Sequence, residues 1–231
     1  MKKALLLLYL LLFSYFLIAQ QKDYTNIKFK SKLRSYTKTK PKAKELGIEK
    51  QVFTELADLL TLDSFTEKEK KDLANKLWLA AHDPKKFDFV YKDFSLKTIK
   101  SWGVKIKFED INYEPNPYLA EWTNNGDDYL YIQWAVNQIL TYVQLMTYSE
   151  KAKVAQKNIH DLILLKNMKF YPARSNEFAY DYLHRNNAIL KKKGLTILIY
   201  NNNFDYTVCK IEDKDKVIEL FAKLKWEFVV P

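Results

Sequence analysis

KKKGLTILIYNNNFDYTVCKI, residues 191–211, is the stretch that decides the fold class. Three lysines followed by Gly194 are typical of a helix end, because cations favour the helix C-terminus and glycine easily adopts a left-handed conformation. Residues 195–200 and 205–211 are rich in β-branched and aromatic side chains. Since three asparagines separate them, this pattern predicts a β-hairpin that follows a helix.

Helical spacing of apolar residues surrounds this hairpin on both sides. A helix capped by Ser175 is expected before it, and a helix capped by Asp213 and a short strand at 226–230 after it. Upstream, the same spacing predicts helices over 49–62, 66–82, 83–103, 134–146 and 151–165. We expect extended chain at 104–108, where apolar residues alternate with lysines, and at 129–132, and a loop at 166–174, which contains a proline. Thr66 and Glu69 have the spacing of a capping box. We therefore expect one α+β domain over 49–231, with several amphipathic helices and a small sheet that includes the C-terminal β-hairpin.

The N-terminus has the pattern of a bacterial secretory signal peptide. Lys2 and Lys3 precede an apolar run from Ala4 to Ala19, and the expected cut follows Ala19. The run has about 16 residues, fewer than the ~20 that a spanning helix prefers. Residues 1–19 are therefore read as a signal peptide of a periplasmic or secreted protein, with an uncleaved N-terminal membrane anchor as the alternative.

A basic segment follows, and we read residues 20–48 as a flexible linker. Lys28–Lys44 contains eight basic residues and no acidic one. Such a block is typical of a solvated tether, and it could also contact an anionic envelope surface. Most of the formal net charge of +10 lies in the first 50 residues, because residues 51–231 hold 26 Lys or Arg and 25 Asp or Glu. Since the body is nearly neutral and export is expected, we do not expect a nucleic-acid partner.

Two stretches carry a resemblance to a known family. One runs from the expected helix at Asp83–Pro84 through Trp102–Gly103–Val104 to residues 116–120. The other is the helix ending at Lys193–Gly194–Leu195 with its hairpin and terminal helix. Together they resemble a bacterial domain-of-unknown-function family over about half of the chain. The resemblance implies an α+β fold and supplies no catalytic residue.

Few residues suggest catalysis. Asp181 and His184 lie three apart on one face of an expected helix, where a carboxylate could orient an imidazole as a general base. A surface pair on a helix explains the same spacing. The single cysteine, Cys209, falls in an expected strand, and we expect it to be a small buried side chain because free cysteine is usually buried. The chain has only four glycines and no phosphate-binding loop. We therefore expect no cofactor and no metal site.

Aromatic side chains are concentrated between residues 102 and 134. Trp122, Tyr129, Tyr131 and Trp134 belong to this group, which also contains several asparagines. On the surface, the group would suit a glycan or a protein partner; in the interior, it is core. Both interpretations remain open at this point.

These patterns favour a non-catalytic protein over an enzyme. The expectation is an exported binding or protein-interaction module. Two alternatives remain: a cell-envelope hydrolase that uses Asp181 and His184, and a surface-tethered structural component that uses Lys28–Lys44.

Overall fold

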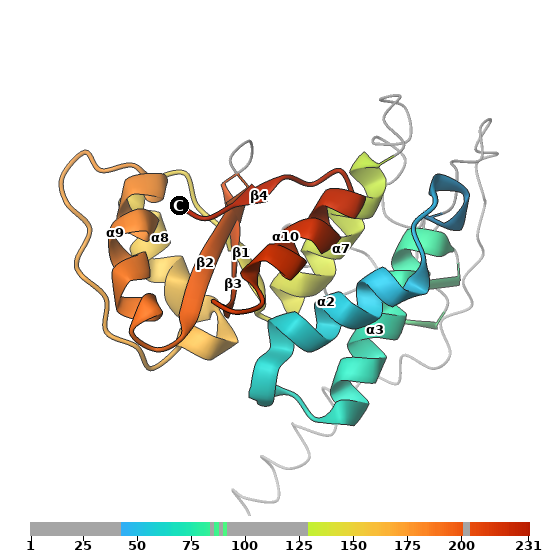
Figure 1. Cartoon of the computed structure of the whole chain (residues 1–231). Coiled ribbons are helices and arrows are strands. Elements are labelled where there is room, and N and C mark those ends of the chain that lie inside the picture. Colours follow the sequence, from blue (N-terminus) through green and yellow to red (C-terminus); the bar gives the residue numbers. More distant parts are fainter. Residues whose placement is uncertain (1–42, 84–85, 88–89, 92–128, 201–203) are drawn as a thin grey trace, which may run out of the picture. The chain divides into compact units, whose positions relative to one another are not determined.

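The computed structural model describes residues 43–83, 86–87, 90–91, 129–200 and 204–231 (Figure 1). All of them belong to one compact unit. The named elements are, in chain order, η2 (Ala43–Leu46), α2 (Lys50–Thr61), η3 (Leu62–Ser64), α3 (Glu67–His82), α7 (Leu130–Tyr142), β1 (Met146–Tyr148), α8 (Ala152–Asn158), η5 (Ile159–Asp161), η6 (Ile163–Leu165), α9 (Ala179–Lys191), β2 (Leu195–Tyr200), β3 (Asp205–Lys210), α10 (Lys214–Lys223) and β4 (Phe228–Val229).

The four strands form one antiparallel sheet in the order β1-β3-β2-β4. Its centre is the predicted hairpin, in which Leu195 pairs with Lys210 and Tyr200 pairs with Asp205. Gly194 has a φ of +72°, so the predicted left-handed helix end before β2 is confirmed. The α+β class with a small sheet and a C-terminal hairpin is therefore confirmed.

The sheet is buried on both faces because its strands alternate apolar side chains between two cores. Leu198 and Cys209 belong to one core with residues of α2, α3, α7 and α10. Ile197, Ile199 and Tyr206 belong to the other, with residues of α8 and α9. Figure 1 shows α8 and α9 on one side of the strands and the remaining helices on the other. The described residues thus form three layers: helices, sheet and helices.

The first two predicted helices match α2 and α3 closely. At the start of α3, the Thr66 hydroxyl accepts a hydrogen bond from the Glu69 N–H at 3.3 Å. The Glu69 carboxylate accepts one from the Thr66 N–H at 2.8 Å. The predicted capping box is therefore confirmed, and it satisfies two groups at a helix end that would otherwise lack partners.

The region between residues 129 and 148 differs from the prediction. Residues 130–132 are the first turn of α7 and not extended chain, and α7 ends at Tyr142 instead of continuing to Met146. Met146–Tyr148 form β1, because β3 offers an unpaired edge and Met146 pairs with Thr207 there. The Thr207 hydroxyl also donates to the Leu145 carbonyl at 2.6 Å. Long-range pairing outweighs the local helical pattern here.

The helices around residues 151–179 are shorter than predicted. α8 ends at Asn158 and is followed by the short turns η5 and η6. α9 starts at Ala179, with Phe178 and not Ser175 at the N-cap position. A contact with the start of α8 fixes this boundary, because Ala152 N–H donates to the Glu177 carbonyl at 3.3 Å.

Several predictions fall outside the described residues. They include the signal peptide 1–19, most of the linker 20–48, the strand at 104–108 and, apart from residues 86–87 and 90–91, most of the helix at 83–103. Within the ranges that the structure describes, no helix combines the length and the apolar character that crossing a membrane requires.

Candidate functional site

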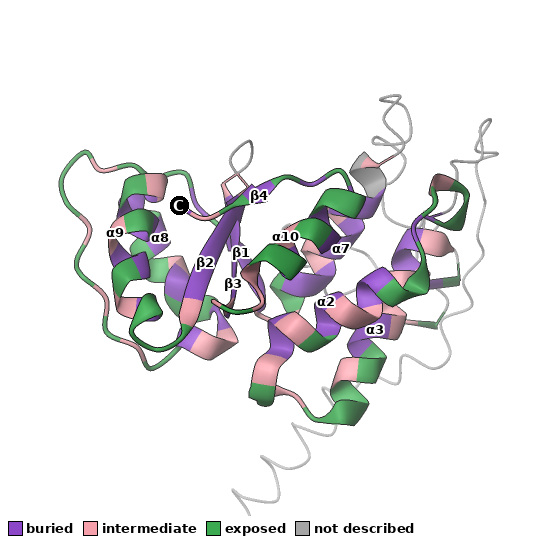
Figure 2. Ribbon diagram, viewed as in Figure 1, coloured by how far each residue is buried: buried purple, intermediate pink, exposed green. Residues whose placement is uncertain are grey.

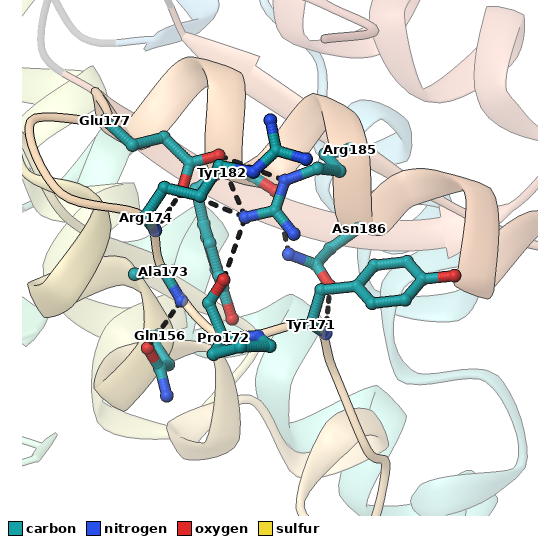
Figure 3. A network of polar contacts seen from close by, with 9 residues as sticks. All are labelled: Gln156, Tyr171, Pro172, Ala173, Arg174, Glu177, Tyr182, Arg185 and Asn186. Atoms are coloured by element: carbon teal, nitrogen blue, oxygen red, sulfur yellow. Dashed lines mark hydrogen bonds and ion pairs between the residues drawn. The ribbon is translucent and has the colours of Figure 1, made fainter.

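Arg185 of α9 lies at the centre of a polar network that holds residues 166–178, here called the connecting segment (Figure 3). Its guanidinium donates to both Glu177 carboxylate oxygens, with Nη2 at 2.9 Å from each and Nε at 3.1 Å from Oε1. Nη2 also donates to the Pro172 carbonyl at 2.9 Å. The rings of Tyr171 and Tyr182 lie 5.7 and 5.8 Å from the guanidinium carbon. This arrangement uses the planar fork of arginine in a way that lysine could not reproduce.

Two amides attach the same segment to both helices. The Asn186 side-chain oxygen accepts from the Tyr171 N–H at 2.7 Å, and its amide donates to the Tyr182 carbonyl at 2.9 Å. On α8, Gln156 accepts from the Ala173 N–H at 2.8 Å. Since backbone groups supply most of these contacts, the network fixes the path of the segment and leaves its side chains to point elsewhere.

The Glu177 carboxylate is the one acidic group in this network. Burial alone would raise its pKa, but the Arg174 N–H, the Arg185 guanidinium and the charge of the Arg174 side chain outweigh burial and lower the pKa below its ordinary value. Its side chain is only 7% exposed, and that of Arg185 is 20% exposed. The pair is therefore matched internally, and its charge is not available to a partner.

The connecting segment and α8 together present what we call the basic–aromatic surface. Phe178 is 69% exposed and Tyr171 is 50% exposed. A β-bridge between Lys151 and Phe178 brings that ring to the start of α8. The surface comprises Lys151, Lys153, Lys157, Tyr171, Arg174 and Phe178, all of them exposed.

The contacts above bring Phe178 to the start of α8 and the backbone of Ala173 to Gln156 of the same helix. Lys153 and Lys157 are one turn apart on α8, and Gln156 lies between them in sequence. Because Gln156 binds the N–H of Ala173, the connecting segment passes beside α8 at that point, whereas the Arg174 side chain runs toward Glu177 (Figure 3). Figure 2 shows that the connecting segment is largely exposed along its course. Lys151 and Phe178, both exposed, therefore lie next to each other at the start of α8.

Charge is unevenly divided between the two helical layers. Residues 150–193, which supply α8, the connecting segment and α9, hold ten Lys or Arg and four Asp or Glu. Residues 43–83 hold six basic and nine acidic residues, and residues 194–231 hold five and six. The near-neutral body therefore consists of a positive layer and a negative remainder.

The lysines of the two layers also differ in their partners. Near α2, α3 and α10, ion pairs include Lys76 with Asp72 and Lys216 with Glu55. In residues 150–193, every basic residue except Arg185 is exposed. Within the described part of the chain, none of these nine exposed cations forms an ion pair. Unpaired like charges at a spacing of four, as at Lys153 and Lys157, weaken a helix slightly.

A second unusual group is the buried carboxyl of Asp205 in β3. Burial raises its pKa to about 6, and a hydrogen bond with the Asn137 side chain opposes the rise. Tyr148 and Tyr200 flank it as cross-strand neighbours. A carboxyl with this pKa could exchange a proton near neutral pH, which is the range used in acid–base catalysis.

The predicted pair Asp181 and His184 lies on the outer face of α9, and both residues are exposed. The His184 ring stacks on Tyr180, with 6.4 Å between ring centroids and 9° between ring planes. In the ranges that the structure describes, no cluster of three or more His, Cys, Asp or Glu is suited to hold a metal ion. The use of this pair in catalysis stays a prediction.

The predicted aromatic group is only partly described. Trp122 and the side chain of Tyr131 lie outside the described residues. Tyr129 and Trp134 are half-buried and pack against the core that contains α2, α3, α7 and α10. The Tyr129 hydroxyl donates to the Leu46 carbonyl at 3.5 Å. A binding role for the four residues stays a prediction.

Cys209 is buried in β3, as the strand pattern led us to expect. Burial raises the pKa of its thiol to about 12. The thiol is therefore protonated at neutral pH and is a poor nucleophile.

The basic–aromatic surface was missed in the sequence. Its positive charge was hidden because acidic residues elsewhere cancel it in the total. A count over residues 150–193 alone would have revealed it. The comparisons with known proteins bring no further residue to attention, since the chain matches no family model, no curated protein and no solved structure.

Proposed function

We propose that the protein is an exported, non-catalytic binding module that contacts its partner through the basic–aromatic surface. The observation that carries the proposal is the combination of unpaired cations with a rigidly held segment that exposes Phe178 and Tyr171. Exposed aromatic residues beside unpaired charges are typical of interaction sites.

The network behind the surface supports this role. A flexible segment would lose conformational freedom on binding, whereas one fixed by Arg185, Asn186 and Gln156 is already ordered. The binding function therefore depends on the network, although the charges of Arg185 and Glu177 are paired with each other.

Export, cleavage after Ala19 and a tethering role of Lys28–Lys44 belong to the same proposal. They rest on the N-terminal sequence: two lysines, an apolar run and then a basic segment. Under this proposal the basic segment connects the membrane-directed end of the chain to the folded module. The exposed rings would suit a protein or a glycan as the partner.

The test is site-specific photo-crosslinking in cells that express the full chain. A benzophenone amino acid replaces Phe178 in one sample and Tyr142, which is 46% exposed on α7, in the other. We expect a defined adduct from position 178 and a much weaker one from position 142. Equal yields from both positions, or none from either, would contradict the proposal.

A further inference from the structure

Resting on that proposed function, we infer that the basic–aromatic surface binds the headgroup region of an anionic lipid bilayer. The first reason is charge complementarity. Lys151 at the N-cap of α8 and Lys153 and Lys157 within it are exposed, and within the described residues none of the three forms an ion pair. A surface rich in anionic lipid attracts such basic residues, and each one strengthens binding by about fivefold.

The residue types favour a bilayer over other polyanions. Three of the four cations of the basic–aromatic surface are lysines, which act as compact, strongly hydrated point charges and suit the diffuse charge of headgroups. Nucleic-acid sites use arginine more often, because its fork binds phosphate in a bidentate manner. The half-buried arginine of this region, Arg185, already pairs with Glu177.

The exposed rings fit the same partner. Phe178 is wholly apolar and 69% exposed at the edge of the cationic patch, with Val154 also exposed one turn into α8. Tyr171 has an apolar ring with a polar tip. Aromatic and apolar side chains beside lysines are the composition of surfaces that lie in the bilayer interface.

The experiment places a reporter on the surface of the full chain. Ser175→Cys, an exposed position in the connecting segment, is labelled with a polarity-sensitive dye. The buried Cys209 thiol stays unlabelled, because burial raises its pKa to about 12. The labelled chain is reconstituted with vesicles of phosphatidylcholine alone, or with about a third phosphatidylglycerol. Since the dye reports local contact, insertion of the apolar N-terminus does not mimic the signal.

We expect a blue-shifted dye emission only with the phosphatidylglycerol vesicles, and its loss in about 0.5 M salt. Lys151→Gln/Lys153→Gln/Lys157→Gln should weaken this contact about 100-fold, from the fivefold per residue given above. Lys50→Gln/Lys68→Gln/Lys71→Gln is the matched control: it removes three exposed lysines from α2 and α3. The control should keep the signal.

Identical emission with both vesicle types, or equal loss in both triple variants, would overturn the inference. If the first triple variant fails to fold, the loss of the dye signal of the protein with its native lysines in high salt still tests whether these lysines bind the vesicles. A dye response to single-stranded nucleic acid or to an acidic protein, without one to vesicles, also overturns it. If crosslinks still form at position 178 in cells, the binding module survives and its partner is not a lipid. If neither experiment gives a signal, both proposals fail.

Discussion

Arg185 is the single side chain on which the connecting segment depends most. Arg185→Gln removes the forked contact with Glu177 and the bond to the Pro172 carbonyl, and it leaves a carboxylate that is 7% exposed without its cation. We expect a loss of about 2–3 kcal/mol in the free energy of unfolding, somewhat less than the cost of breaking a fully buried pair. Urea denaturation at pH 7 measures it.

Arg174→Gln is the control for that measurement. Its side chain is exposed, and the substitution keeps the backbone N–H that donates to Glu177 while it removes the smaller effect of the Arg174 charge on that carboxylate. It should change the free energy of unfolding by no more than about 0.5 kcal/mol while it weakens binding at the surface. Equal destabilisation by the two substitutions would show that the forked contact does not stabilise the segment.

The contribution of Asp205 to stability falls as pH rises, whereas the contribution of an ordinary ion-paired carboxylate grows as pH rises. Because burial raises its pKa from 3.8 to about 6, the protonated carboxyl favours the folded state, and stability from this group is lost as pH rises from 4 to 7. Asp205→Asn should therefore stabilise the protein by roughly 2 kcal/mol at pH 7.5 and by little at pH 4. Urea unfolding of both proteins at the two pH values measures this.

The exposed Asp181→Asn substitution is the matched control for Asp205, since solvent reaches that carboxylate. Its effect should stay within about 0.5 kcal/mol at both pH values. If Asp205→Asn destabilised the protein at pH 7.5, the charged carboxylate would have favourable contacts that burial does not reveal.

For single residues, the sequence could indicate whether a side chain is buried, but not which groups it contacts. Cys209 was expected to be buried from its place in an apolar strand, and it is. Nothing local distinguishes Arg185 from the other cations of residues 150–193, because its partner Glu177 lies in a loop and its other contact is a carbonyl. Such contacts exist only after the segment has folded back on α9.

Among the elements, β2 shows how a helix side chain completes a sheet edge. Within the described strands, β4 pairs only with Ile199 and Tyr200, so the first half of β2 has no neighbour on that side. Asn187 of α9 accepts from the Ile197 N–H at 2.9 Å. A buried N–H without a partner is costly, so this bond, together with the contacts of the same amide with the Thr196 hydroxyl, helps to attach α9 to the sheet.

Asn187→Ala should therefore accelerate hydrogen exchange at the Ile197 amide about tenfold, because that donor loses its acceptor. Asn186→Ala is the matched comparison, since it should accelerate exchange at the Tyr171 amide instead. Residue-resolved exchange by NMR measures both. The assignment of roles would be wrong if either variant accelerated exchange at both amides to the same degree.

How well the elements could be predicted depends on whether their cause is local. The hairpin, α2 and the capping box of α3 follow from neighbouring residues and were predicted correctly. β1 could not be found in this way, because Met146 adopts a strand only where Thr207 of β3 offers a partner. The late start of α9 has the same origin, since Ala179 N–H donates to the Glu150 carbonyl, 29 positions earlier.

At the scale of the whole molecule, the nearly neutral total charge of residues 51–231 is divided between a positive and a negative layer of the described fold. The sheet separates α8 and α9 from the remaining described helices, and residues 150–193 carry ten basic against four acidic residues. The nearly neutral total of residues 51–231 gave no indication of a charged binding surface, because it sums charges that the fold places in different layers.

The central claim is that the cations of the basic–aromatic surface carry binding. The most direct test measures the crosslinking yield from position 178 of the full chain in two backgrounds. Lys151→Gln/Lys153→Gln/Lys157→Gln should reduce the yield at least tenfold, because the attraction of three unpaired cations is removed. Lys50→Gln/Lys68→Gln/Lys71→Gln, with the same change in net charge, should leave the yield within twofold of the unsubstituted chain. An equal reduction in both backgrounds, or none in the first, would contradict the claim.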